Sequence, residues 1–260
     1  MNALFQFFTN PPETGVAQIV GHTMKPSDGF LALIGYVCAL LTALILHEYA
    51  HGYVAFKCGD DTAKLSGRLS LNPKNHLDLV GTICMFLFGI GWAKPVPINP
   101  ARFKKNYRTS IFLVSVAGVT VNIVLGFLFT GLYYLVCVIT SMAASTVAAS
   151  SVLYVLLYTL SVYFIYGVLL NIGLFLFNLI PLFPLDGSHV LELILPQNCA
   201  VSRFLRRYGM IILYVLLGLS FIADISGIQW LDILGLYLYN VRNLIYSLFS
   251  GFWGLIFGGF

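Results

Sequence analysis

Long apolar runs constrain this chain more than any other feature, because they recur along most of its 260 residues. A helix needs about 20 apolar residues to cross the hydrocarbon of a bilayer, and residues 30–56, 111–138 and 152–180 each meet that length. We expect a further span from about 210 to 222, and residues 236–260 are apolar and aromatic enough either to cross the bilayer or to lie in its interface. The sequence therefore predicts an all-α polytopic membrane protein, a helical bundle of about five to six spans.

One apolar run, residues 79–92, is too short to cross a bilayer in the same way. Basic residues flank it on both sides, within 57–74 and within 94–108. Because loops rich in Lys and Arg stay on the cytoplasmic side, a complete crossing would place one of these basic segments on the wrong side. We therefore expect a short re-entrant element that returns to the cytoplasmic face. Alternating patterns in 63–71 and 94–98 predict short β-strands beside it, and the prolines of the second pattern suit an edge strand.

The charge and the cysteine content argue against nucleic acid binding and against a disulfide or cysteine-ligated framework. The net charge is only +4 and the basic residues are scattered among aliphatic spans, so no nucleic acid partner is expected. The five cysteines are an odd number without C-x-x-C spacing, which argues against a disulfide scaffold or a cysteine zinc site. The composition favours the lipid bilayer as the surroundings of the chain.

His47-Glu48-Tyr49-Ala50-His51 follows the H-E-x-x-H pattern near the end of the first long apolar run. The spacing places two imidazoles one helical turn apart, where they can share a zinc ion, and Glu48 can take a proton from the metal-bound water. Charged side chains inside a membrane helix cost about 2.5–3.5 kcal/mol each on insertion scales. Their presence favours a functional site over the alternative, a helix end with two interfacial histidines.

A catalytic zinc ion takes three protein ligands and keeps one open position, so the chain should supply a third ligand. Asp186 follows a span that runs back to the cytoplasmic side, which brings it to the depth of the histidine pair. The alternative is that Asp186 only caps a helix. His189 could share a helical face with Asp186, but a fourth ligand would close the open position. His22 and His76 stand in polar stretches and are expected to be ordinary loop residues.

With these two motifs in view, the chain resembles the site-2 protease family of intramembrane zinc metalloproteases. The resemblance rests on H-E-Y-A-H in a membrane helix and on the later F-N-L-I-P-L-F-P-L-D-G. Segments A-K-L-S-G-R-L-S-L-N-P and G-W-A-K-P-V-P-I-N-P are also similar to the compact bacterial branch that lacks a PDZ domain. The resemblance covers about residues 41–195. It implies one Zn²⁺ per chain, with ligands His47, His51 and Asp186, and Glu48 as catalytic acid and base.

The same resemblance assigns roles to two asparagines. Asn178 corresponds to a family asparagine that binds substrate backbone or stabilises the oxyanion, although an interhelical hydrogen bond is the structural alternative. Asn122 ends the element A-G-V-T-V-N, which matches the family's Gly-x-x-x-Asn and implies a supporting or substrate-binding residue. The chain departs from that element at Val119 and Val121, where relatives usually carry Pro and Ser.

We expect a single membrane-embedded metalloprotease domain over 1–260, with a catalytic core at about 30–195 and accessory helices at about 200–260. It should lie in a bacterial inner membrane, open its active site toward the cytoplasm and hydrolyse transmembrane protein substrates. One alternative is a non-catalytic metal-binding protein such as a pseudoprotease or chaperone, against which the intact Glu48 argues. A second is an ion-coupled transporter, since broken helices near prolines also occur there.

Overall fold

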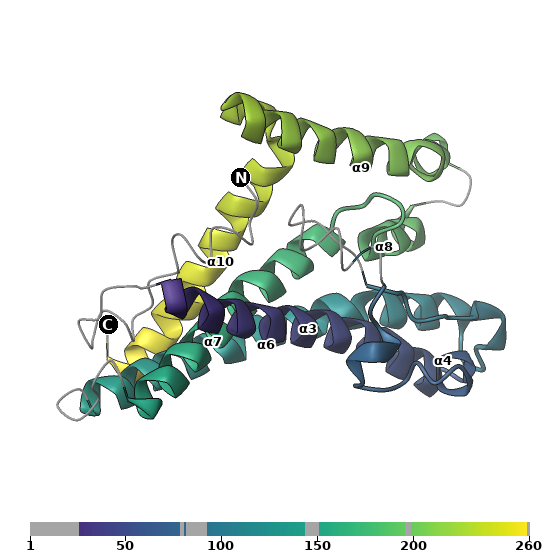
Figure 1. Ribbon diagram of the computed structural model, residues 1–260. Coiled ribbons are helices and arrows are strands. Elements are labelled where there is room, and N and C mark those ends of the chain that lie inside the picture. The colour runs from purple at the N-terminus through teal and green to yellow at the C-terminus, as the bar shows by residue number, and fades with distance from the viewer. Residues whose placement is uncertain (1–25, 79–80, 82–92, 144–150, 196–198, 259–260) are drawn as a thin grey trace.

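The computed structural model describes residues 26–78, 81, 93–143, 151–195 and 199–258, and within these residues it is helical, with no β-sheet (Figure 1). The α-helices are α3 (Pro26–Lys57), α4 (Thr62–Leu65), α6 (Tyr107–Met142), α7 (Val152–Asn178), α8 (Asp186–Ile194), α9 (Ala200–Ser226) and α10 (Ile233–Phe257). Three short 3-10 helices, η1 (Pro73–Asn75), η2 (Pro100–Arg102) and η3 (Gln229–Leu231), lie between them.

Four of the described helices, α3, α6, α7 and α9, are long and apolar enough to cross a membrane. The prediction of an all-α polytopic protein is thus confirmed, although the described residues contain four such helices and not five to six. The C-terminal apolar segment forms α10, which packs against α6, α7 and α9.

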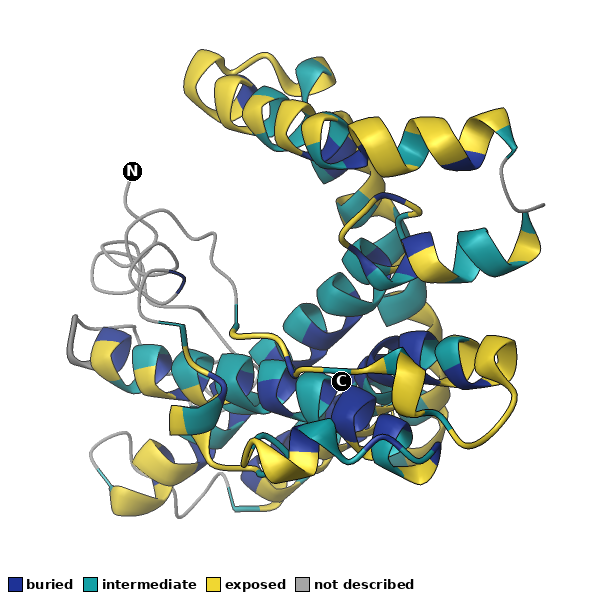
Figure 2. Cartoon of the chain, turned by 90° about the vertical axis from the view of Figure 1, so that its right-hand side faces the viewer, coloured by how far each residue is buried: buried dark blue, intermediate teal, exposed yellow. Residues whose placement is uncertain are grey.

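Helices α3, α6 and α7 pack against one another and form the centre of the molecule. Gly35 of α3 allows a close approach to α7, because a Cβ there would lie 3.1 Å from both the Thr159 carbonyl oxygen and the Tyr163 nitrogen. A hydrogen bond of 3.2 Å between the Thr42 and Tyr163 hydroxyl groups joins the same two helices. Small and hydroxyl-bearing residues are typical of helix contacts in membranes. Figure 2 shows the buried residues on the inner faces of this bundle.

Helix α9 lies apart from this bundle (Figure 1) and is largely exposed (Figure 2). It packs on α10 and on the loop between α7 and α8. Gly209 makes that second contact possible, since a Cβ there would lie 2.9 Å from the Phe183 nitrogen. Leu213 completes it by packing with Leu182 and Leu185 of the loop. The loop that leads to α8 is therefore held by α9.

The predicted strands are wrong. In residues 63–71, the Asp60 carboxylate accepts hydrogen bonds from the backbone and hydroxyl of Thr62 and starts the helical turn α4. In residues 94–98, Lys94 N–H donates to the His76 carbonyl within a single bridge, and Val96 N–H donates to the Glu48 side chain, so the pairing does not extend into a strand. Only one isolated antiparallel bridge, Leu77 to Ala93, appears among the described residues. Apart from residue 81, the predicted re-entrant run 79–92 lies outside the described residues.

Candidate metal centre

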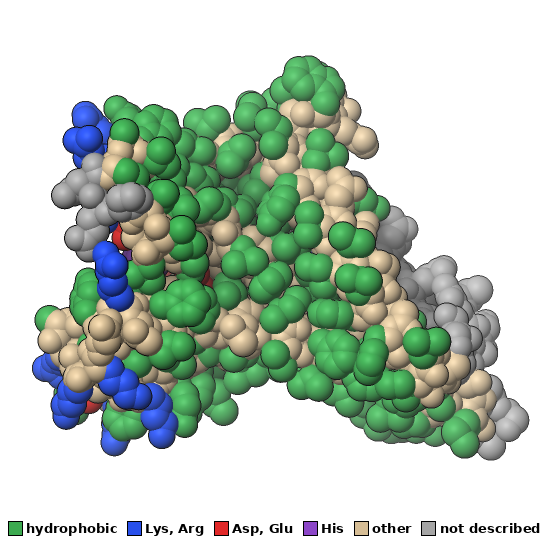
Figure 3. Space-filling model, turned by 180° about the vertical axis from the view of Figure 1, so that it is seen from behind, with side chains coloured by type: hydrophobic (Ala, Val, Ile, Leu, Met, Phe, Trp, Pro, Cys, Tyr) green, Lys and Arg blue, Asp and Glu red, His purple; other side chains and the backbone are tan. Residues whose placement is uncertain are grey.

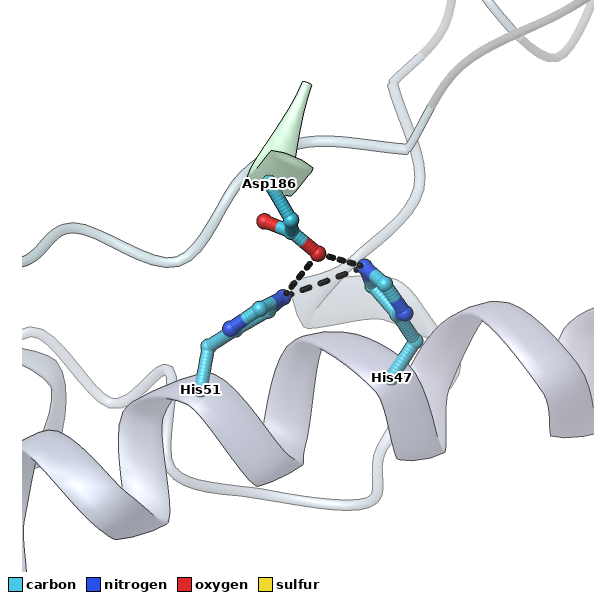
Figure 4. A group of neighbouring side chains, drawn as sticks. All are labelled: His47, His51 and Asp186. Carbon is cyan, nitrogen blue, oxygen red and sulfur yellow. Dashed lines mark hydrogen bonds and ion pairs between the residues drawn. The ribbon is translucent and has the colours of Figure 1, made fainter. Parts of the chain in front are cut away.

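His47, His51 and Asp186 converge from two helices (Figure 4). The histidines stand one turn apart on α3, with ring centroids 4.6 Å apart, because residues at i and i+4 share a helical face. Asp186 is the first residue of α8, and its Oδ2 lies 3.5 Å from His47 Nε2 and 3.2 Å from His51 Nε2. Both imidazoles are buried. The structure thus brings Asp186 to a histidine pair that lies far from it in sequence.

Gly187 explains how Asp186 reaches the histidines. A Cβ at Gly187 would lie under 3.0 Å from the backbone oxygens of Leu179 and Ile180, which follow α7. Backbone atoms cannot move aside as a side chain can, so only glycine fits there. Leu185, the N-cap residue of α8, makes no side-chain capping bond, and Asp186 Oδ2 has no hydrogen-bond partner among the described residues. Asp186 therefore points at the histidines instead of capping its helix.

The hydrogen bond at Nδ1 of each imidazole determines whether Nε2 carries a proton or a lone pair. His51 Nδ1 lies 2.7 Å from the Val114 carbonyl oxygen, and His47 Nδ1 lies 2.6 Å from Asn122 Oδ1. Each neutral ring must donate through Nδ1 to these oxygens and so keeps a lone pair on Nε2. The two Nε2 atoms lie 3.1 Å apart and face Asp186 Oδ2. Three converging electron-pair donors fit a cation, and this mixed nitrogen and oxygen set suits zinc.

Gly118 of α6 closes the site from a third side. A Cβ at this position would lie under 3.0 Å from atoms of both imidazoles. One turn further along α6, Asn122 is fully buried and also donates from Nδ2 to the Ala43 carbonyl and to Asn171 Oδ1. The Gly-x-x-x-Asn spacing thus places the backbone of Gly118 against both imidazoles and the side-chain amide of Asn122 at His47 Nδ1.

A cleft of about 410 Å³ opens onto these residues, and Glu48 and Asn178 both line it. Glu48 Oε2 accepts a 2.9 Å hydrogen bond from Val96 N–H, which leaves the other carboxylate oxygen for a reacting group. Asn178 Nδ2 donates to the Leu174 carbonyl of its own helix at 3.1 Å. An amide nitrogen has two N–H groups, so Asn178 retains one donor for a ligand in the cleft.

A second carboxylate, Asp60, holds the extended segment beside the cleft. Its oxygens accept hydrogen bonds from Thr62 and from Asn99 N–H, the latter at 2.6 Å. Burial alone would raise the pKa of Asp60, but these hydrogen bonds outweigh it and hold the pKa below its ordinary value. Glu48 and Asp60 together fix the two ends of residues 96–99.

Some predicted residues lie elsewhere. His189 lines the cleft but is exposed and does not belong to the grouped metal-ligating atoms. His76 is buried in its loop, where Nε2 bonds to the Ser70 carbonyl, and His22 lies outside the described residues. The sequence reasoning missed the contact role of Gly118 and missed Asn171 altogether. A signal existed, because Asn171 is a polar residue inside an apolar membrane run.

Comparison with known proteins gives a consistent result. Residues 35–220 match peptidase family M50. YwhC of Bacillus subtilis, named as a candidate zinc metalloprotease, is 42% identical over 188 residues, which cover 72% of this chain and 81% of YwhC. Rip2 of Mycobacterium tuberculosis, similarly named, is 30% identical over 118 residues, 44% of this chain and 45% of Rip2. No solved structure matches the chain.

Proposed function

Since the chain belongs to peptidase family M50, the site-2 protease family, and is a membrane-integrated zinc metalloprotease, we propose that it hydrolyses membrane-spanning proteins at the centre formed by α3 and α8. The observation that carries this proposal is the convergence of two imidazole lone pairs and the Asp186 carboxylate oxygen that faces them on a cleft that Glu48 also lines. In this proposal His47, His51 and Asp186 hold one zinc ion per chain. Three protein ligands leave a position open for reaction.

The chemistry that bound zinc supplies is Lewis acidity, which polarises a carbonyl and lowers the pKa of water. Glu48 takes the proton of the attacking water and later gives it to the leaving amine. Its hydrogen bond from Val96 N–H fixes one oxygen, so the other carries the proton. Asn178 donates its remaining N–H to the tetrahedral oxygen. Asn122, which is buried behind His47, supports a ligand and does not touch substrate.

The substrate lies along residues 96–99, an extended path that is held by Glu48 and Asp60 and that lines the cleft with Val96 and Ile98. A helical amide is shielded by its own hydrogen bonds, so a substrate helix must unwind before cleavage. An unwound segment can pair with this edge by β-addition. Ile98→Pro removes a backbone donor there and should lower cleavage without changing zinc content. Unchanged cleavage would contradict substrate pairing along residues 96–99.

The active site opens toward the cytoplasm of a bacterial cell. The exposed basic residues that follow α3 and precede α6 lie at the end of α3 that carries His47 and His51, and loops of this kind stay cytoplasmic. In Figure 3 Lys and Arg side chains gather at one end of the molecule, beside a hollow that shows acidic and histidine atoms. We assign a single domain, with a catalytic core at about 30–195 and accessory helices at about 200–260.

Glu48→Gln tests the proposal against its two rivals. The amide keeps the size of Glu48 but cannot take a proton, so cleavage of a membrane-spanning substrate in detergent should fall about 10²–10⁴-fold, while bound zinc stays near one per chain. A pseudoprotease would show zinc but no cleavage by the wild type. A transporter would show ion flux in proteoliposomes that does not depend on Glu48. Normal cleavage by Glu48→Gln would overturn the assignment of the base.

A further inference from the structure

A chain of buried amides runs from α7 through α6 to the His47 ring. Asn171 Nδ2 donates to the Gly167 carbonyl at 2.7 Å, and Asn122 Nδ2 donates to Asn171 Oδ1 at 2.8 Å. Asn122 Oδ1 in turn lies 2.6 Å from His47 Nδ1. Both asparagines have no exposed surface. Neither can therefore contact a substrate, and each hydrogen bond is made away from water.

The direction of every bond in this chain is set by the Gly167 carbonyl, which can only accept. If Asn171 were turned over, its oxygen would face that carbonyl at 2.7 Å, so its nitrogen must point there and its oxygen must face Asn122. Asn122 must then present its nitrogen to Asn171 and its oxygen to His47. A second acceptor, the Ala43 carbonyl at 3.3 Å, favours the same orientation of Asn122.

The consequence falls on the tautomer of His47. An oxygen at Asn122 requires a proton on Nδ1, and the lone pair then lies on Nε2, which faces Asp186. An inverted Asn122 would offer N–H to Nδ1 and move the ring proton to Nε2, where it would occupy the metal-binding direction. His51 needs no such chain, because its Nδ1 faces the Val114 main-chain carbonyl, which cannot invert.

We propose that Asn122 and Asn171 form a positioning pair that fixes the His47 tautomer for zinc binding, with Asn171 acting through Asn122. This inference rests on the proposed assignment of His47 as a zinc ligand. It differs from simple helix adhesion, because adhesion needs a hydrogen bond between α6 and α7 in either direction. Tautomer control needs the one direction that ends in an acceptor at His47.

Zinc affinity of the full-length protein in detergent, measured by competition with a chromophoric chelator, tests the pair. Asn171→Leu should weaken Zn²⁺ binding about 10-fold, within the 10- to 100-fold range for partners of metal-ligating histidines. Thr130→Val is the matched control, since it removes another fully buried polar group of α6 that bonds only within its own helix. Its zinc affinity should equal that of the wild type.

A double variant separates tautomer control from adhesion. Aspartate at position 122 can only accept when ionised, so Asn122→Asp should restore zinc affinity in the Asn171→Leu protein to within about threefold of wild type. Adhesion alone predicts the opposite, because the double variant lacks the whole interhelical bond. An Asn171→Leu protein that binds zinc as tightly as wild type, or a double variant no tighter than Asn171→Leu, overturns the proposal.

If Asn171→Leu does not purify in folded form, two variants of Asn122, which bonds directly to the His47 ring, are compared instead. Asn122→Asp should keep zinc affinity, and Asn122→Leu should lower it about 10- to 100-fold; equal affinities would refute the pair. Substrate cleavage is measured separately on the wild type. Zinc binding without cleavage would refute the proposed function but not the positioning pair. Unchanged zinc affinity in the variants would refute the positioning pair but not the proposed function.

Discussion

Replacing Gly118 by alanine adds one methyl group between α6 and the histidine pair. A Cβ at this position would lie 2.5 Å from His47 Cε1 and under 3.0 Å from His51 Nε2, whereas ordinary contact begins at 3.4 Å. The difference between 3.4 and 2.5 Å means that the His47 ring must move by about 0.9 Å. Metal-ligand distances tolerate about ±0.2 Å. The methyl group therefore displaces the rings further than a zinc site accepts.

The expected result is a loss of metal without a loss of fold. Zinc affinity should fall about 100-fold, at the upper end of the losses seen when a residue supporting metal ligands is replaced. The metal-free Gly118→Ala protein should unfold near the wild-type temperature. Two effects support this: alanine favours a helix interior by about 0.5–1 kcal/mol over glycine, and the imidazoles can rotate away from the methyl group.

Chelator competition in detergent gives the zinc affinity, and thermal unfolding after metal removal gives the stability of the fold. Gly126→Ala is the control, because it lies on the same helix and its Cβ would meet Ile172 Cγ1 at 3.1 Å, away from the ligands, and Asn171 Cβ only at an ordinary contact distance of 3.9 Å. Its zinc affinity should be unchanged. If Gly118→Ala bound zinc as tightly as Gly126→Ala, the reasoning from close packing against the ligands would be refuted.

Three further predictions follow from the site. Removal of zinc with a chelator should abolish cleavage and readdition should restore it, which a metal-independent protease would not show. Asn178→Ala should lower kcat about 10²–10³-fold with zinc content unchanged, and a change confined to KM would assign Asn178 to binding alone. Because hydrogen bonds lower the pKa of folded Asp60, their stabilising contribution is present above about pH 4 and is lost as pH falls through the lowered pKa. The free energy of unfolding of the wild type should therefore fall more steeply below pH 4 than that of Asp60→Asn. Acid unfolding measures both, and equal slopes would contradict this.

Sequence patterns predicted the parts of the site whose geometry is local. The spacing of His47 and His51 defines a shared helical face, and the long apolar runs define the helices that carry the site. Asp186 was predicted from the direction in which its span returns, and the structure places it at the histidines. These inferences need only a helical period and a count of membrane crossings.

The features that the sequence did not predict depend on contacts between distant elements. The alternation in 63–71 is compatible with a strand, but hydrogen bonds between Asp60 and Thr62 begin a helical turn there. The role of Asn171 depends on which α6 residue faces it, and the role of Gly118 depends on how closely α6 approaches α3. No periodic pattern in one sequence carries that information.

The packing of α9 has a consequence for how the metal centre is assembled. Both histidines stand on one continuous helix, whereas Asp186 follows a loop whose far side rests on α9 through Gly209 and Leu213. Asp186 therefore takes its position from two contacts, that of α8 with α6 and that of the preceding loop with α9. A displacement of α9 by lipid or by an incoming chain should therefore shift the loop and, with it, Asp186. Zinc affinity should then depend on the position of α9.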